Sequence, residues 1–424
     1  MRDRYDVVVV GGGTAGVIAA VQAGRENVST LIIEKSELLG GSIVNAYVNA
    51  PGLFHAWKKQ IIAGIGWELI CRSMDGENRA YPDFSKQERF RHYLHQIGIN
   101  GAYYSLICDE AVAGAGVDVL FGAMCARIRE EDGVKYISVC TKTGLREIQA
   151  KVLIDCTGDA NAVSLAGYEV ELGEERQPAT YSCCLSGYDY NALDLEKIGA
   201  AYEKEVAAGN LTYTDVGWET DRFDPQWLRN YGGNANHVFI GGVSGRTSEE
   251  RSELSLKARL TILKLLRFFR TQEGLENITL TSIAPECGIR ESVRIKGKKR
   301  ITVEDYLSGK RYGDDVCYSF YPVDLHTASR TGLRQIYLEE GVVPSVPRGA
   351  LLPAGSRNLL AAGRCISSDQ LANSALRVEA TCMATGQAAG AIAALAAKRN
   401  IDAEEVPMEE IYEVLVRNNA IIPE

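Results

Sequence analysis

The chain has 424 residues, which is long enough for two or three domains with sizeable cores. Hydrophobic residues make up 46% and charged residues 24%, so the composition excludes a disordered chain and indicates a globular protein. The formal net charge of −9 argues against a nucleic-acid-binding protein, which would need a basic face.

The sequence also lacks the patterns of membrane proteins and metalloproteins. No run of about 18 apolar residues occurs, and the first residues lack the pattern of a signal peptide. We therefore expect a cytoplasmic protein that contacts no membrane. The eleven cysteines are irregularly spaced and include no Cys-x-x-Cys pair, so we expect no bound metal and no iron–sulfur cluster.

The first forty residues have the pattern of a dinucleotide-binding unit. Residues 6–10 predict a buried strand, residues 17–23 a helix and residues 30–33 a second strand that ends at Glu34. The turn between the first strand and the helix is G-x-G-x-x-G, formed by Gly11, Gly13, Thr14, Ala15 and Gly16. Its glycines allow a tight bend and a close approach to a pyrophosphate, and the carboxylate at the second strand end can bind ribose hydroxyls.

Four later segments extend this unit. An E-K-x-x-x-x-G-G-S run stands at 34–42, and three short strands, predicted at 123–130, 134–141 and 145–149, form a β-meander where NAD dehydrogenases usually have a helix. A further strand ends in the D-x-T-G-D turn at 155–159. The fourth segment is the strand ending in A-A-G-R-C at 361–365, which is followed by the G-Q-A-A-G helix.

With these segments the sequence resembles the FAD-dependent oxidoreductases that have the glutathione-reductase type of FAD fold, of the succinate dehydrogenase/fumarate reductase type. Its motifs match a bacterial branch of that family. The runs R-E-S-x-R-I, Y-P-x-D-x-H, A-G-R-C-I-S and R-V-x-x-T-C-M-A-x-G-Q-A-A-G stand here at 290–295, 321–326, 362–367 and 377–390.

The resemblance implies that the chain binds FAD non-covalently. The backbone N–H groups at the start of the G-Q-A-A-G helix would then point at the flavin ring. The positions that correspond to cofactor-binding positions of the family are Gly11, Gly13, Thr14, Ala15, Gly16, Glu34, Lys35, Gly41, Ser42, Cys125, Thr157, Gly158, Asp159, Gly363, Arg364, Val378, Glu379 and Ala380.

We therefore predict an α/β fold with a discontinuous, Rossmann-like FAD-binding domain and an α+β substrate or cap domain. The FAD-binding domain would comprise residues 1–50, 105–170 and 345–424, with the β-meander as its crossover connection. Residues 51–104 and 171–344 would form the cap.

Three further helices are predicted, at 86–97, 248–274 and 408–417. The glycine cluster at 241–245 lacks the spacing of a second dinucleotide site, and we expect a turn there. The only basic run, 294–301, predicts a hairpin with solvated lysines, although an anionic partner is an alternative reading.

The candidate catalytic residues are His326, Arg290 and Arg377. His326 and Asp324 share one face of an extended segment, so a carboxylate can orient the imidazole as a general base. Arg290 binds a polar substrate or forms a buried ion pair with Glu291, and Arg377 lies just before the flavin-facing helix. Each of these residues also has a purely structural interpretation.

Three other histidines are weaker candidates for a role at the flavin or in metal binding. His55 could face the flavin, and a covalent histidyl–flavin link there is disfavoured by the spacing. His92 and His95 are i, i+3 neighbours, which as a pair are more typical of a surface or of packing than of a metal site.

We expect an enzyme that oxidises a C–H bond at a hydroxyl- or amine-bearing carbon of a small polar, sugar-like substrate, with hydride transfer to flavin N5. Two alternatives stay open at this point. One is a reductase of an activated C=C or C=O bond that uses an external electron donor, and the other is a flavin-holding subunit that relays electrons to a partner protein. The sequence names neither the electron partner nor the oligomeric state, and it is compatible with a homo-oligomer.

Overall fold

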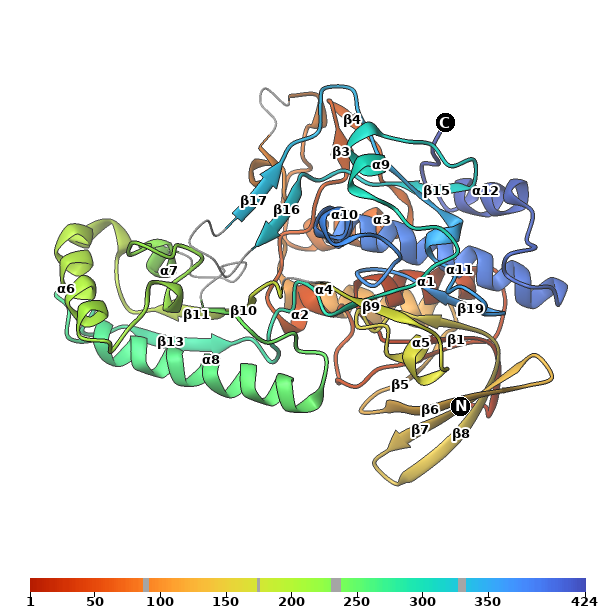
Figure 1. Ribbon diagram of the computed structural model, residues 1–424, viewed down its shortest axis with the longest axis horizontal. Coiled ribbons are helices and arrows are strands. Elements are labelled where there is room, and N and C mark those ends of the chain that lie inside the picture. Colours follow the sequence, from red (N-terminus) through yellow and green to blue (C-terminus); the bar gives the residue numbers. More distant parts are fainter. Residues whose placement is uncertain (87–90, 174–175, 230–237, 327–332) are drawn as a thin grey trace.

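The computed structural model describes residues 1–86, 91–173, 176–229, 238–326 and 333–424. It has two lobes (Figure 1). The larger lobe carries both ends of the chain, and the smaller one, which projects from it, contains α6, α7 and α8.

The larger lobe is built on a sheet with the strand order β5-β2-β1-β8-β7-β6, in which β19 also pairs with β8. Strands β5, β2, β1, β8 and β19 run parallel, whereas β6, β7 and the first half of β8 form an antiparallel meander. The bounds are β1 Arg4–Val10, β2 Thr30–Ile33, β5 Asp118–Leu120, β6 Met124–Glu131, β7 Val134–Thr141, β8 Gly144–Asp155 and β19 Leu359–Ala361.

The meander confirms the predicted crossover, with one correction. The strands expected separately at 145–149 and 152–155 are a single strand, β8, whose first half pairs with β7 and whose second half pairs with β1 and β19. Lys151 does not interrupt it, because alternate side chains point to opposite sides of a strand and its ammonium pairs with Asp6 at 2.8 Å.

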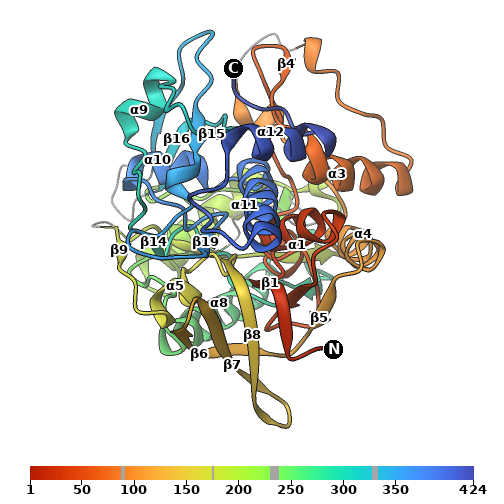
Figure 2. The same cartoon turned by 90° about the vertical axis from the view of Figure 1, so that its right-hand side faces the viewer.

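The sheet buries both faces, as its run of valines predicts. Val7 and Val9 of β1 face a helical layer formed by α1 (Thr14–Arg25), α3 (Gly64–Gly76), α4 (Gly101–Gly114), α11 (Glu379–Arg399) and α12 (Met408–Arg417). Val8 and Val10 pack instead against the meander and α5 (Asn161–Leu165). Figure 2 shows α1, α11 and α12 above the sheet and the meander below it.

Helices α1 and α11 cross at very short range because of two glycines in the G-Q-A-A-G run. A Cβ added to Gly386 would overlap the carbonyl oxygen of Ala15, and one added to Gly390 would overlap that of Ala19. Helix α11 is long and apolar enough to span a membrane by length and composition, but 89% of its apolar stretch is buried inside the structure. It has the burial of a core helix.

Gly386→Ala should therefore destabilise the protein by about 1–3 kcal/mol, because the two helices would have to move apart in a filled core. Urea unfolding followed by circular dichroism measures this loss. The matched control is Gly114→Ala at the end of α4, where an added Cβ meets nothing within 4 Å. Equal stability of the two variants would contradict the packing argument.

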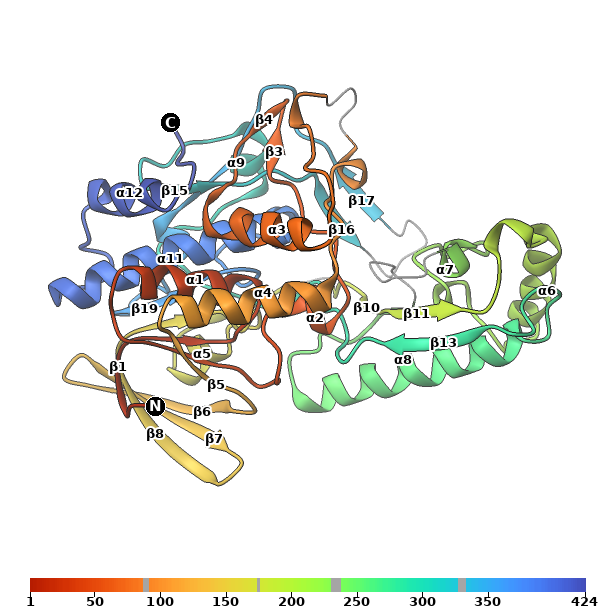
Figure 3. The same cartoon turned by 180° about the vertical axis from the view of Figure 1, so that it is seen from behind.

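The smaller lobe has its own core of buried side chains between Ala179 and Cys287. Two antiparallel strand pairs, β10–β12 and β11–β13, lie against the long helix α8 (Figure 3). The bounds are β10 Ala179–Tyr181, β11 Cys183–Ser186, α6 Leu195–Ala207, α7 Gln226–Arg229, β12 Val238–Ile240, α8 Ser248–Phe269 and β13 Thr279–Ile283. The helix predicted at 248–274 is confirmed over Ser248–Phe269 but ends five residues earlier than expected, and the helix predicted at 408–417 is confirmed as α12.

The remaining elements complete the larger lobe or connect the two lobes, and the core of the larger lobe includes parts of both predicted insertions, such as α3 and β15. The predicted domain boundaries themselves stay a prediction. These elements are α2 Ser42–Asn45, β3 His55–Ala56, β4 Lys59–Gln60, β9 Val170–Leu172, β14 Val293–Ile295, α9 Val303–Ser308, β15 Asp315–Tyr318, β16 Val323–His326, β17 Leu333–Ile336, β18 Ser345–Pro347 and α10 Gln370–Leu376.

Two local predictions are wrong. In its described part, the helix expected at 86–97 has no α-helical turn: Lys86 ends a 3-10 turn, Phe84–Lys86, and a second 3-10 turn spans His92–Leu94, while residues 87–90 lie outside the described residues. The basic run at 294–301 forms no hairpin, because β14 pairs with β9 instead. Its cations pair with carboxylates from distant segments, including Glu169, Glu404 and Asp314.

Candidate active site

The carboxyl ends of four parallel strands meet at one edge of the sheet. Val10 of β1 lies beside Ile33 of β2 and Asp155 of β8, and Asp155 lies beside Ala361 of β19. The chain continues from these strand ends into every predicted cofactor-binding turn. In parallel α/β sheets a ligand binds at the carboxyl ends, where neighbouring connections diverge to opposite sides of the sheet.

The glycine turn has the geometry that its spacing predicts. Gly11 has φ +100°, and a Cβ there would lie 2.6 Å from the carbonyl oxygen of Cys156. A Cβ on Gly16 would overlap the carbonyl oxygen of Gly11, so this glycine is needed for the close packing of α1 on the turn. A Cβ on Gly13 would meet only the Cα of Gly41, at 3.6 Å. Gly13 therefore leaves room on the side where the second glycine pair approaches.

Glu34 directly follows β2 and has a buried carboxylate beside the turn. Its Oε2 accepts a hydrogen bond from the Gly12 N–H at 2.6 Å, and its Oε1 accepts one from the Ser36 N–H at 2.8 Å. These bonds hold the acid at the end of the turn, and each oxygen keeps a second lone pair for a ribose hydroxyl.

The D-x-T-G-D turn is joined to the end of β19. Asp159 accepts hydrogen bonds from Arg364 at 2.5 Å, from Arg251 at 2.7 Å and from the Ser292 hydroxyl at 2.6 Å. Burial alone would raise the pKa of Asp159, but Arg364 and Arg251 lower it below its ordinary value. Two predicted cofactor residues, Asp159 and Arg364, thus bind each other and fix the two turns together.

Helices α1 and α11 both begin at this edge without a side-chain cap. Their first N–H groups and the positive ends of their dipoles suit a pyrophosphate and an electron-rich flavin ring. Glu379 opens α11, and its carboxyl group is buried near Ser42 of the Gly41–Ser42 turn. Burial raises the pKa of Glu379 to about 7.

These residues fit FAD. The uncapped helix ends, the open side of Gly13 and the buried Glu34 carboxylate are the donor and acceptor set that a dinucleotide needs. Two predicted positions lie at its margin. Lys35 pairs with Glu286, and Cys125 lies in β6 opposite Val139. Their contact with the cofactor stays a prediction.

A second cluster of polar groups is formed around β16. The Nε2 of His326 lies 3.2 Å from Oδ2 of Asp324, as expected for two residues on one strand face. Burial lowers the pKa of His326 to about 4, so its imidazole is neutral near pH 7. A neutral ring that donates from Nε2 to the carboxylate keeps a lone pair on Nδ1, and Nδ1 has no hydrogen-bond partner among the described residues.

Two arginines complete this cluster. The guanidinium of Arg377 donates to the carbonyl oxygen of Asp324 at 3.0 Å, and that of Arg290 donates to the carbonyl oxygen of Pro178 at 2.7 Å and lies over the Phe239 ring. Burial, together with the neighbouring Arg377, lowers the pKa of Arg290 to about 9. All three predicted catalytic residues are therefore brought together, and Arg377 connects them to the start of α11.

The expected alternative for Arg290, an ion pair with Glu291, is wrong. The carboxylate of Glu291 pairs with Arg294 and accepts hydrogen bonds from the side-chain amides of Gln177 and Gln370. The chain bends at Arg290 before β14 begins, and the two side chains contact different segments, Pro178 for Arg290 and Arg294 for Glu291.

Two members of the site, Gln177 and Tyr321, were not among the predicted residues. Gln177 accepts a hydrogen bond from the His326 N–H at 3.2 Å, and Tyr321 is buried beside Asp324 and Arg377. Glu379 was predicted for its backbone N–H group, whereas its buried carboxyl group is also part of the site. Tyr321 begins the Y-P-x-D-x-H run, so its position there was the available signal. His92 packs on Tyr321 with ring centroids 4.8 Å apart, whereas His55 and His95 contact each other.

Acid should destabilise the protein through His55 and His326, because burial lowers the pKa of both rings from 6.5 to about 4. Below pH 6.5 the unfolded chain binds protons that the folded chain does not, so this stability is complete above pH 6.5 and is lost towards pH 4. Between about pH 7 and about pH 5 the free energy of unfolding should fall by about 2 kcal/mol per histidine. Urea titrations at both pH values test this. His55→Phe, which keeps the stacking on Phe84, should lose about 2 kcal/mol less than the wild type, and an equal loss would contradict the assignment.

Comparisons with known proteins agree with these features. A family model described as FAD dependent oxidoreductase matches residues 6–415. The chain is 28% identical over 260 residues to digeranylgeranylglycerophospholipid reductase 2 of Methanococcoides burtonii, covering 59% of this chain and 58% of that protein. It is 29% identical over 259 residues to digeranylgeranylglycerophospholipid reductase of Methanosarcina acetivorans, covering 59% and 57%. The matches thus span less than three fifths of the length of these two relatives.

Among solved structures, a geranylgeranyl bacteriochlorophyll reductase-like protein from Thermoplasma acidophilum aligns with a TM-score of 0.44 and 15% identity. The alignment covers 99% of this chain and 84% of that one.

Proposed function

Since this chain belongs to the family of FAD-dependent oxidoreductases, we propose that it oxidises a hydroxyl- or amine-bearing carbon of a small polar, sugar-like substrate. The observation that carries this proposal is the neutral, buried imidazole of His326, which is held by Asp324 and whose Nδ1 has no hydrogen-bond partner among the described residues. A neutral imidazole oriented by a carboxylate is suited to take a proton from a hydroxyl or amine group.

Each member of the cluster has a distinct task in this reaction. FAD, when bound, supplies the acceptor for the hydride. His326 accepts the substrate proton at Nδ1, and Asp324 keeps the ring in the tautomer that this requires. Arg290 and Arg377 bind the polar groups of the substrate, since guanidinium groups present several N–H donors in a fixed plane.

A reductase of a C=C bond is the second candidate. It is supported by the names of the two relatives described above, which are both digeranylgeranylglycerophospholipid reductases. In that case Arg290 would act as the proton donor, because burial lowers its pKa to about 9. This reaction needs an external electron donor. The charged groups around His326 suit a polar substrate better than a long isoprenoid chain, which would need apolar walls. A role as an electron-relaying subunit and a location in the cytoplasm stay predictions.

A dye-linked assay of the FAD-loaded protein tests the proposal. Glucose, glycerol, lactate and alanine represent the polar hydroxyl and amine compounds, and an artificial dye accepts the electrons. We expect at least one class to reduce the dye, with a rate that depends on the compound's concentration. Reduction of an unsaturated lipid at the expense of a reduced donor, with no dye reduction by any polar compound, would replace the first candidate by the second.

A further inference from the structure

The outer face of α8 carries a row of exposed leucines that do not pack into the core of this chain. Leu256 and Leu260 are each 57% exposed and Leu263 is 44% exposed. The opposite side of the helix packs into the core of the smaller lobe. The residues buried there include Leu254, Ala258, Ile262 and Leu265. Figures 1 and 3 show α8 along the outside of that lobe.

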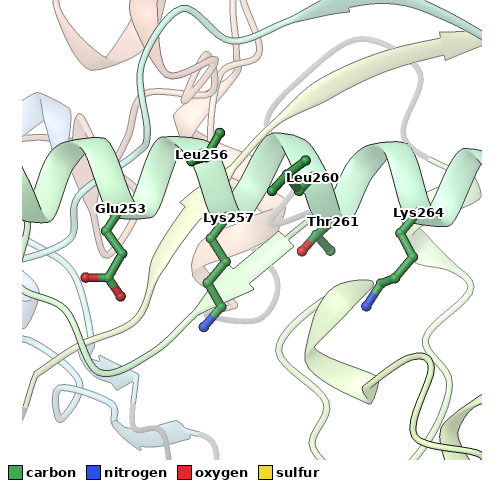
Figure 4. Close-up of a pocket in the computed structure, with 6 residues that line it drawn as sticks. All are labelled: Glu253, Leu256, Lys257, Leu260, Thr261 and Lys264. Carbon is green, nitrogen blue, oxygen red and sulfur yellow. The ribbon is translucent and has the colours of Figure 1, made fainter.

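The spacing of these leucines is typical of the apolar stripe along which two helices pack against each other, here called the seam. Positions 256, 260 and 263 follow the i, i+4, i+7 pattern that places residues on one narrow stripe of a helix. Figure 4 shows Leu256 and Leu260 on α8, with the longer side chains of Glu253, Lys257 and Lys264 extending beside them; these residues, with Thr261, line a surface hollow. This surface hollow has a volume of about 370 Å³.

Charges on the same stripe change sign along the helix. Glu249 and Glu253 precede the leucines, and Arg267 follows them; all three are exposed. Within the described parts of the chain, neither Glu253 nor Arg267 forms an ion pair. The stripe therefore has an acidic end, an apolar centre and a basic end, and all three parts are exposed to solvent.

We propose that this stripe binds the same stripe of a second copy of the chain, with the two α8 helices antiparallel. A two-fold axis near Leu260 places this residue against its own counterpart and Leu256 near Leu263 of the other copy. The same axis places Glu253 opposite Arg267, because 253 and 267 are equally far from 260. A contact of this kind is self-complementary, as a two-fold symmetric dimer requires.

The charge order favours this occupant over others. Two copies in a parallel arrangement would bring Glu253 beside Glu253 and Arg267 beside Arg267, which is repulsive. An anionic membrane surface would attract the basic end of the stripe but repel its acidic end. Only the antiparallel pair places opposite charges together at both ends.

The small area of this contact predicts a low dimer affinity. A single helix pair lies at the low end of protein interfaces, so the dimer should dissociate on dilution. We expect sedimentation velocity of the FAD-loaded, full-length protein to show a reversible equilibrium between a monomer of 46.2 kDa and its dimer.

Leu260→Glu should weaken the dimer at least tenfold, because it places two carboxylates at the centre of the seam. The matched control is Leu145→Glu, which changes an exposed leucine at the start of β8, outside the smaller lobe. The visible absorption of bound FAD reports in each variant that the protein is folded and loaded.

Charge reversal gives the more specific test. Glu253→Arg and Arg267→Glu should each weaken the dimer several-fold, and the variant that combines them should recover most of the wild-type affinity, because the opposite charges face each other again. Recovery in the double variant is expected only of an antiparallel pair.

Three results would overturn the proposal. The wild type could stay monomeric at all concentrations, the dimer could form but be insensitive to Leu260→Glu, or the double reversal could fail to restore it. Sedimentation of the protein with vesicles of anionic phosphatidylglycerol, lost in Leu260→Glu while the protein alone stays monomeric, would assign the stripe to a membrane surface instead.

Discussion

Replacing His326 by alanine should slow the reduction of FAD by the polar substrate by about 10²- to 10⁴-fold, the range typical of a lost general base. His326 is the neutral imidazole whose Nδ1 has no partner among the described residues and whose Nε2 is fixed by Asp324. The FAD content should not change, because His326 lies on β16 and not on the turns that hold the cofactor. Anaerobic stopped-flow mixing measures the rate, and the visible spectrum measures the FAD content.

The matched control is His55→Gln. Burial lowers the pKa of His55 to about 4, as it does for His326, but its ring stacks on Phe84 and contacts His95 outside the cluster. We expect the control to keep a rate close to that of the wild type. In the wild type the rate should fall as the pH approaches 4, because His326 then becomes protonated. A His326→Ala variant that is reduced at the wild-type rate would show that another group, such as Glu379, takes the proton.

Gly13→Ala should weaken FAD binding without weakening the apoprotein. The added methyl group would meet only the Cα of Gly41, at an ordinary contact distance of 3.6 Å, and φ of Gly13 is −80°, which alanine adopts readily. The same methyl group would fill the space through which a pyrophosphate approaches the turn. Overpacking of about 1–3 kcal/mol corresponds to a dissociation constant raised about 5- to 150-fold.

Fluorescence titration of the apoprotein with FAD measures this constant. Gly16→Ala is the contrasting variant, because its methyl group would overlap the carbonyl oxygen of Gly11 and should lower the stability of the apoprotein itself. If Gly13→Ala binds FAD as tightly as the wild type does, the turn does not hold the pyrophosphate.

The parts of the fold that were predicted correctly have local signals. The valines of β1, the spacing of Gly11, Gly13 and Gly16, and the alternating strands of the meander each specify their structure within a few residues. The two predicted strands that merge into β8 were separated by Lys151, and only the position of Asp6 on the neighbouring strand shows why the lysine is tolerated there.

The parts that failed depend on distant residues. The segment around His92 and His95 was expected to be helical, but its rings pack on Tyr321 and His55. Likewise, Arg290 and Glu291 are adjacent in sequence and carry opposite charges. Arg290 instead contacts Pro178, and Glu291 pairs with Arg294. These partners depend on how the chain folds around them, which the local sequence does not predict.

The candidate site divides in the same way. The relation of His326 to Asp324 follows from the period of a strand, and it was predicted. Gln177 lies 149 residues before His326, and its hydrogen bond to the His326 N–H could not be seen without the fold. The same holds for the bonds that Asp159 makes with Arg364 and Arg251.

The most direct test of the proposed reaction is the anaerobic visible spectrum of the FAD-loaded protein after separate additions of a polar hydroxyl compound and of NADH. The proposal predicts that the flavin absorption is bleached by a hydroxyl compound that His326 can deprotonate, and that NADH leaves it unchanged. Rapid bleaching by NADH, with none by the polar compounds, would contradict it and would identify the protein as a reductase supplied by a nicotinamide donor.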